Sequence, residues 1–307
     1  MKIAFMGTPE FAVPTLQRLI DDGHEIVAVF TQPDKPKGRG YKLAPPPVKE
    51  LAEKYDLKVF QPTKMKDGTV LSILKDCQPE VIVVVAYGRL LPKDIIEFPK
   101  YGCINGHASL LPKYRGAGPI QWCVINGEAE TGVTTMQMAE GLDTGDMLLT
   151  IKTQIGENET SGELHDRLCL LSAEIMSKTI KELEKGTLIP IKQDDSLSNY
   201  APMLDKKIAV LDFNKTAKEL HNLIRGLSPW PVAFTYLDGK LLKVHKAKPV
   251  EDYKGEIGKL LDDKRLIIGC GDKAIEFLEI QLEGAKRLDA KSFLLGKRLE
   301  KGTFFGE

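Results

Sequence analysis

Long apolar runs are absent from this 307-residue chain. No segment reaches the roughly 18 consecutive apolar residues that a membrane-spanning helix requires. The opening residues Met1 to Gly7 also lack the charged segment, apolar run and small-residue cleavage site of a secretory signal peptide. The sequence therefore predicts a cytoplasmic protein, with a monomer as the default expectation.

Cysteine is scarce, and the spacings typical of metal sites are missing. The chain has five cysteines with no CxxC pair, and its five histidines form no HxxxH pair. We therefore expect reduced thiols in the interior, no disulfide framework and no metal site. The cysteines are Cys77, Cys103, Cys123, Cys169 and Cys270.

The chain as a whole has no excess of one charge, with 43 Lys plus Arg and 43 Asp plus Glu. Residues 206–307 nevertheless hold 20 basic and 15 acidic side chains, against 23 and 28 in residues 1–205. A basic C-terminal part is typical of a protein with a polyanionic partner such as a nucleic acid. So small an excess can also arise by chance.

Apolar segments alternate with helical patterns over the first 190 residues. The run at residues 80–86 is apolar on both faces, as in a parallel strand that is covered on both sides. We therefore predict an α/β fold with a Rossmann-like, mostly parallel sheet. Strands are predicted at residues 2–6, 25–30, 58–60, 80–86, 102–105, 132–138 and 147–155, and helices at 9–22, 47–55, 68–75, 119–125 and 160–184.

A second, smaller domain is predicted after a polar, aperiodic segment that begins at residue 190. Residues 1–189 would form the first domain, residues 190–207 a linker and residues 208–307 the second domain. The second domain has a helical pattern at residues 215–225, followed by short alternating segments separated by turns. This spacing is typical of a small all-β sandwich or barrel, and an oligonucleotide-binding (OB-like) barrel is one candidate.

A dinucleotide-binding fingerprint is missing after the first strand. Gly7 is followed by Thr, Pro and Glu rather than by the GxGxxG pattern. An open parallel sheet still places its site at the carboxyl ends of the strands, so functional residues are expected in the loops there. These are the loops after Phe5, Phe30, Ala86, Asn105 and Met138.

Two of these loops carry residues suited to chemistry. Asn105 and His107 alternate at the end of one strand, which can aim an amide and an imidazole into the same cleft. Asp143 lies in a glycine-rich turn that can bring a carboxylate towards the imidazole. Each loop also has a structural interpretation, as a strand end with a backbone-bonded histidine and as an ordinary β-turn.

The segment at residues 33–47 is a third candidate, because it carries Lys35, Lys37, Arg39 and Lys42 beside the expected cleft. Lysine and arginine in such a loop can grip a phosphate backbone, and arginine can also read a base edge. The alternative is a solvated loop without a binding role.

Taken together, these motifs resemble those of the folate-dependent formyltransferases. NGHASLLP at residues 105–112 and GLDTGD at residues 141–146 carry the resemblance. Further stretches resemble the branch of the family that acts on methionyl-tRNA, and the resemblance covers essentially the whole chain. They are GTPEFA at 7–12, QPD at 32–34, GRG at 38–40, QP at 61–62 and RGLSPWP at 225–231.

The resemblance implies catalytic roles for Asn105, His107 and Asp143. It implies 10-formyltetrahydrofolate as the donor, the amine of methionine on initiator tRNA as the acceptor, and a C-terminal barrel that contacts the tRNA. It also implies that the basic segment contacts the tRNA, with Arg39 wedged into the acceptor stem. The pterin would bind at Ser109, Leu110, Leu111, Pro112, Gly88, Arg89 and Leu90.

These residues suit attack of an amine on a formyl carbon. The attack creates a tetrahedral oxyanion, for which the Asn105 amide and a protonated His107 are suitable hydrogen-bond donors. Asp143 would orient His107 and stabilise its charge, and neither a covalent enzyme intermediate nor a metal is implied. The sequence leaves open which group accepts the amine proton and returns it to folate.

Two other interpretations remain. A formyltransferase acting on an amino-sugar nucleotide or another small amine, or a folate hydrolase domain, could share Asn105, His107 and Asp143. The chain could also be a non-catalytic RNA-binding module. The basic segment and the basic C-terminal part favour the tRNA substrate.

Overall fold

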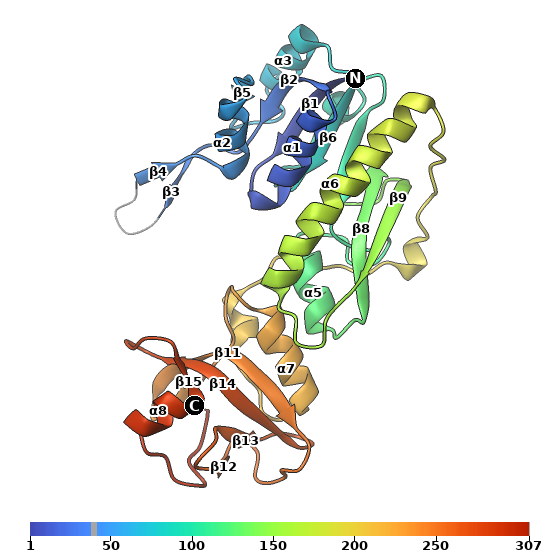
Figure 1. Cartoon of the computed structure of the whole chain (residues 1–307). Coiled ribbons are helices and arrows are strands. Elements are labelled where there is room, and N and C mark those ends of the chain that lie inside the picture. The colour runs from blue at the N-terminus through green and yellow to red at the C-terminus, as the bar shows by residue number, and fades with distance from the viewer. Residues whose placement is uncertain (38–41, 307) are drawn as a thin grey trace. The chain divides into compact units, whose positions relative to one another are not determined.

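The computed structural model of the protein describes residues 1–37 and 42–306 (Figure 1). The chain divides into two compact units. The first contains Met1–Gly116, Glu130–Thr153 and His165–Ala201, and the second contains Ala117–Ala129, Gln154–Leu164 and Pro202–Glu307. Two stretches of the predicted first domain therefore belong to the second unit, and most of the predicted linker belongs to the first.

The first unit is built on a seven-stranded sheet with the order β5-β2-β1-β6-β7-β8-β9. The first five strands in this order are parallel, and β8 runs antiparallel to β7. The predicted mostly parallel α/β sheet is thus confirmed. The strands are β1 (Lys2–Gly7), β2 (Glu25–Phe30), β5 (Val59–Phe60), β6 (Val81–Val85), β7 (Cys103–His107), β8 (Glu130–Gln137) and β9 (Met147–Gln154).

Helices cover this sheet on both faces, which is why its central strand β6 is apolar throughout. All five residues of β6 are buried. On one face, side chains of β1 and β6 join a hydrophobic cluster with those of α3 and α4. On the other, Thr15 of α1 and Thr135 of β8 form hydrogen bonds to Ser172 and Thr179 of α6. The helices are α1 (Val13–Asp21), α2 (Pro47–Lys54), α3 (Thr69–Cys77), α4 (Lys93–Ile96) and α6 (Ser161–Lys185).

Short elements complete the first unit. A 3-10 helix, η1 (Glu10–Ala12), leads into α1, and another, η2 (Asp195–Leu197), lies in the segment after α6. The strands β3 (Lys35–Lys37) and β4 (Lys42–Ala44) form a separate antiparallel pair within the basic segment.

The antiparallel direction of β8 corrects one premise of the sequence analysis. Ile104 pairs with Gln137 and His107 pairs with Thr134. The end of β8 therefore lies beside the start of β7, and not at the carboxyl edge where the loops after β1, β2, β6 and β7 meet. The loop that carries Asp143 must run back along the sheet to reach His107.

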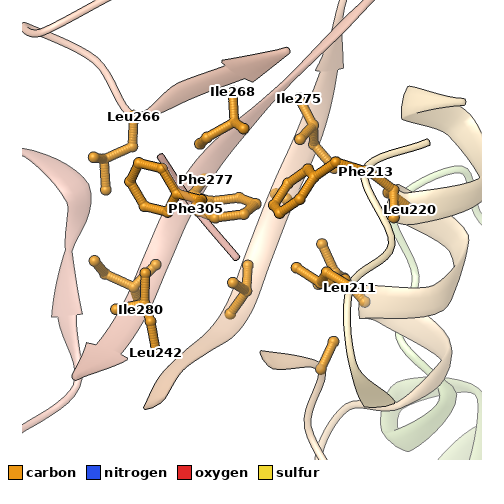
Figure 2. Close-up of a cluster of buried hydrophobic side chains, with 14 of the residues drawn as sticks. Leu211, Phe213, Leu220, Leu242, Leu266, Ile268, Ile275, Phe277, Ile280 and Phe305 are labelled. Carbon is orange, nitrogen blue, oxygen red and sulfur yellow. The ribbon is translucent and has the colours of Figure 1, made fainter. Parts of the chain in front are cut away.

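The second unit contains the predicted antiparallel β-domain. Its sheet has the order β10-β11-β14-β13-β12, with β15 paired to β14. Figure 2 shows the core between this sheet and α7, where Phe213, Phe277 and Phe305 pack among aliphatic side chains. The elements are α5 (Pro119–Ile125), η3 (Lys206–Ala209), α7 (Ala217–Gly226), β10 (Phe234–Leu237), β11 (Lys240–Val250), β12 (Leu260–Asp262), β13 (Ile267–Gly269), β14 (Ala274–Leu282), β15 (Leu288–Asp289) and α8 (Ala290–Gly296).

Over the part of the chain that the structure describes, no helix combines the length and apolar character needed to cross a membrane.

Candidate active site

Asn105 and His107 lie on one face of β7, because successive side chains of a strand point to opposite faces. Asn105 pairs with Val84 of β6 and Met136 of β8. Gly106, between them, faces α6, where an added Cβ would lie 3.2 Å from the hydroxyl oxygen of Ser172. The missing side chain at residue 106 lets α6 pack closely against one face while the amide and imidazole occupy the other.

His107 is 6% exposed, and its two ring nitrogens face two different acceptors. Nε2 lies 2.9 Å from the main-chain oxygen of Tyr114, and Nδ1 lies 3.6 Å from Oδ2 of Asp143. A carbonyl oxygen can only accept, so Nε2 carries a hydrogen. An imidazolium ring donates towards both partners, whereas a neutral ring with its hydrogen on Nε2 turns a lone pair towards the carboxylate.

Asp143 reaches His107 from the loop between β8 and β9. Its backbone is left-handed, with a φ of 53°, and its Oδ2 accepts a hydrogen bond of 2.8 Å from the amide of Gly116. Gly145 allows the return of the loop, because a Cβ there would lie 1.7 Å from the main-chain oxygen of Gln137. The carboxylate is therefore mostly buried and held on two sides, by a backbone amide and by the imidazole.

The loop after β7 is held by a hydrogen bond within the loop and by another from β8. The Ser109 hydroxyl donates to the main-chain oxygen of Lys113 over 2.7 Å, and the Thr134 hydroxyl donates to the main-chain oxygen of Ser109 over 2.8 Å. Leu111 is 7% exposed. Ser109 thus shapes the turn that contains Leu110 and Pro112, and its hydroxyl already has an acceptor.

The loop after β6 lies at the same edge of the sheet, because β6 and β7 are adjacent and parallel. Gly88 has a φ of +75°, and its main-chain oxygen accepts a hydrogen bond from the side-chain amide of Gln32. Arg89 donates to the main-chain oxygen of Thr63 over 2.9 Å. Leu90 is 76% exposed, which leaves it available to a ligand.

The basic segment is described only in part. The ammonium group of Lys35 donates to the side-chain oxygen of Gln32 over 3.2 Å. Arg39 lies outside the described residues, as do the side chains of Lys37 and Lys42.

Four residues of the site carried no functional signal in the sequence. Tyr114 and Gly116 bind His107 and Asp143 through backbone groups, which any residue type can supply. Gln193 and Asn199 lie in the segment predicted to be a linker. Gln193 donates a hydrogen bond to the main-chain oxygen of Asp143, and Asn199 accepts one from the backbone amide of Tyr114. Among the residues that the structure describes, no cluster of His, Cys, Asp and Glu side chains could hold a metal ion.

Comparison with known proteins identifies the family. Residues 1–180 match the formyl transferase family, and residues 203–298 match the formyl transferase C-terminal domain. This chain is a member of the formyl transferase family. A methionyl-tRNA formyltransferase from Alkaliphilus oremlandii is 51% identical over 310 residues, with all of both chains covered. Another from Geobacter metallireducens is also 51% identical, over all of this chain and 99% of its own.

Solved structures share the fold at lower identity. An N-formyltransferase from Helicobacter canadensis, in complex with folinic acid and dTDP-3-aminofucose, is 22% identical with a TM-score of 0.69. The match covers 90% of this chain and 98% of that one. HypX from Aquifex aeolicus in complex with tetrahydrofolic acid is 18% identical with a TM-score of 0.62, over 99% of this chain and 51% of that one. At these identities the likeness supports the fold alone.

Proposed function

We propose that this protein transfers the formyl group of 10-formyltetrahydrofolate to the α-amine of methionyl initiator tRNA. The observation that carries the proposal is the convergence of His107 and Asp143 in a chain that aligns over its whole length with methionyl-tRNA formyltransferases. Asn105 lies two residues before His107 on β7, so both side chains are on the same face of the strand. The reaction supplies formylated methionine for translation initiation, in the cytoplasm where charged tRNA is found.

The chemistry is a direct transfer through a tetrahedral intermediate. The amine nitrogen bonds to the formyl carbon, the bond from that carbon to folate N10 breaks, and a proton passes from the amine to N10. Asn105 Nδ2 and His107 donate hydrogen bonds to the oxyanion, and the loss of one such donor typically costs about 10²- to 10³-fold in rate. A free α-amine has a pKa of about 7.7–8.0, so a substantial fraction is already neutral near pH 8.

The hydrogen bond to Tyr114 constrains how His107 takes part. Its Nε2 hydrogen is directed at the main-chain oxygen of Tyr114. A hydrogen bond from this nitrogen to substrate therefore requires His107 to share or exchange that partner. Asp143 stabilises the imidazolium form while the exchange occurs, because its carboxylate faces the other ring nitrogen.

The folate donor is proposed to bind between the loops that follow β6 and β7. These loops contain Gly88, Arg89 and Leu90, and Ser109 to Pro112. Leu90 provides exposed apolar surface, and backbone groups of both loops are suited to recognising a pterin edge. The Ser109 hydroxyl is already bonded within its loop, so we assign Ser109 a role in shaping the site.

The tRNA is proposed to contact Lys35, Lys37, Arg39 and Lys42 and the basic C-terminal part, residues 206–307. Phosphate contacts would make binding weaken with salt. Arg39→Ala should therefore lower tRNA affinity. It should also reduce, by about one, the steepness with which the logarithm of the binding constant falls against the logarithm of the salt concentration. An unchanged affinity and salt slope, measured by filter binding, would remove Arg39 from the interface.

The first test is transfer of labelled formyl to four acceptors: charged initiator tRNA, charged elongator tRNA, free methionine and an amino-sugar nucleotide. The proposal predicts preference for the initiator. Transfer only to a small acceptor would refute the tRNA assignment and retain the formyl chemistry.

Variants then test the three catalytic residues. Asn105→Ala, His107→Ala and Asp143→Asn should each lower kcat by about 10²- to 10³-fold while tRNA affinity stays nearly unchanged. His24→Ala is the control, since His24 directly precedes β2, at the opposite edge of the sheet from the loops of the site. If all three variants retain turnover, the catalytic assignment is wrong.

A further inference from the structure

The segment after α6 packs onto the loops of the site. Ile191 and Met147 exchange two main-chain hydrogen bonds of 2.8 Å, which adds a bridge beside β9. Further along, Arg115 donates its amide to the main-chain oxygen of Asn199 over 3.0 Å and accepts from the amide of Ala201 over 2.7 Å. Residues 191–201, which we call the brace segment, are thus anchored at both ends within the first unit.

Gln193 is the buried polar side chain of the brace segment, with an exposed fraction of 6%. Its Nε2 donates to the main-chain oxygens of Asp143 over 2.9 Å and Gly145 over 2.7 Å. Its Oε1 accepts from Nε and Nη2 of Arg115 over 3.1 and 2.8 Å. Both amide hydrogens and the amide oxygen are therefore used, and two of these bonds fix the loop that carries Asp143.

This loop needs such support because its backbone conformation is unfavourable. A non-glycine residue in the left-handed region costs free energy and persists only where surrounding contacts hold it. Asp143 is such a residue, with a φ of 53°. The two carbonyls that Gln193 binds belong to residues 143 and 145, on either side of Thr144. Their hydrogen bonds therefore restrain the backbone directly after Asp143.

The brace segment also supports the second partner of His107. Oδ1 of Asn199 accepts a hydrogen bond from the amide of Tyr114, whose main-chain oxygen accepts from His107 Nε2. The same segment therefore holds Asp143 through Gln193 and Tyr114 through Asn199. These are the two groups that face the two nitrogens of His107.

We propose that Gln193 is a positioning residue for formyl transfer, which holds the Asp143 carboxylate at His107 through the main-chain oxygens of residues 143 and 145. The inference rests on the proposed function of Asp143 and His107. Gln193 need not touch either substrate, so its effect should appear in kcat and not in the binding of folate or tRNA.

The test compares Gln193→Leu and Gln193→Glu with a stability control, Ser177→Ala. Ser177 of α6 is 1% exposed, and its hydroxyl donates to the carboxylate of Asp22, away from the loops of the site. Glutamate at residue 193 can still accept from Arg115 but cannot donate to the loop. Both variants of Gln193 should lower kcat by about 10- to 100-fold with little change in KM, because misplacement of about 1 Å costs up to about 10²-fold.

Ser177→Ala should lower the melting temperature and leave kcat within about twofold of the parent. Equal losses of kcat in Ser177→Ala and Gln193→Leu would overturn the proposal, since a general loss of stability would then explain both. An unchanged kcat in both Gln193 variants would also overturn it.

A double-mutant cycle with Asp143→Asn, measured in single turnover, separates this inference from the proposed function. If Gln193 acts through Asp143, Gln193→Leu should cause no further loss in the Asp143→Asn background. Additive losses would show that Gln193 acts elsewhere. A fully active Asp143→Asn variant would instead refute the catalytic role of Asp143 itself.

Discussion

Replacing Gly145 with alanine should slow formyl transfer by displacing the loop that carries Asp143. A Cβ on Gly145 would lie 1.7 Å from the main-chain oxygen of Gln137, where real Cβ atoms stay beyond 3.0 Å. The obstructing atoms belong to the backbone at the end of β8, which a side-chain rotation cannot clear. Residue 145 must therefore move by about 1.3 Å, the difference between these two distances.

This displacement is large compared with the tolerance of the site. Oδ2 of Asp143 lies 3.6 Å from Nδ1 of His107, and Gly145 is only two residues further along the chain. A shift of 1 Å in a catalytic group can cost about 10²-fold in rate. We expect Gly145→Ala to lower kcat by about this factor, with folate and tRNA binding changed much less.

Single-turnover formyl transfer to charged initiator tRNA would measure the effect. Gly296→Ala is a suitable control, because a Cβ on Gly296 meets no heavy atom within 4 Å and the residue lies at the end of α8. Gly145→Ala with the kcat of the parent enzyme would refute the reasoning, since it would show that transfer does not depend on the position of this loop.

Two further predictions concern stability. Burial raises the pKa of Asp22, but hydrogen bonds from Ser177, Lys181 and Arg18 outweigh it and lower the pKa to about 2. The ionised Asp22 therefore stabilises the fold fully above the pKa of about 3.9 that it has in the unfolded chain, and this stabilisation is lost as pH falls towards 2. Asp22→Asn should flatten the pH dependence of the unfolding free energy in that range, as measured by urea titration. An unchanged slope would contradict this assignment. In the second unit, Phe277 is fully buried, and Phe277→Ala should lower the unfolding free energy by about 3–5 kcal/mol, against little change for the 53% exposed Phe304. Equal effects of the two substitutions would contradict the core shown in Figure 2.

Local patterns were enough to predict most strands and helices of the first unit, but not α4 or the β3–β4 pair, nor α8 of the second unit. The VIVVV run of β6 is apolar on both faces because both faces are covered, and that requirement is visible in the residues themselves. The alternation of Asn105 and His107 likewise places both side chains on one face of β7, since the period of a strand is two residues. The second unit showed its antiparallel character through short segments separated by turns.

Long-range pairing was not predictable in the same way. The sequence indicated a strand at residues 132–138 but not its direction, and the direction determines where the loop with Asp143 leaves the sheet. The polar, aperiodic residues 190–207 predict a linker. In the structure, residues 191–201 contact the first unit through individual hydrogen bonds between residues 44 to 86 positions apart, which impose no local periodicity.

The sequence by itself determined the residue types of the site and the strand that carries Asn105 and His107, because side-chain chemistry and strand period are local properties. The tertiary structure alone decided the partners of those residues. The main-chain oxygen of Tyr114 and the amide of Gly116 act through backbone atoms, which every residue has and no sequence pattern marks. Gln193 reaches the loop of Asp143 only because the chain returns to the sheet after α6.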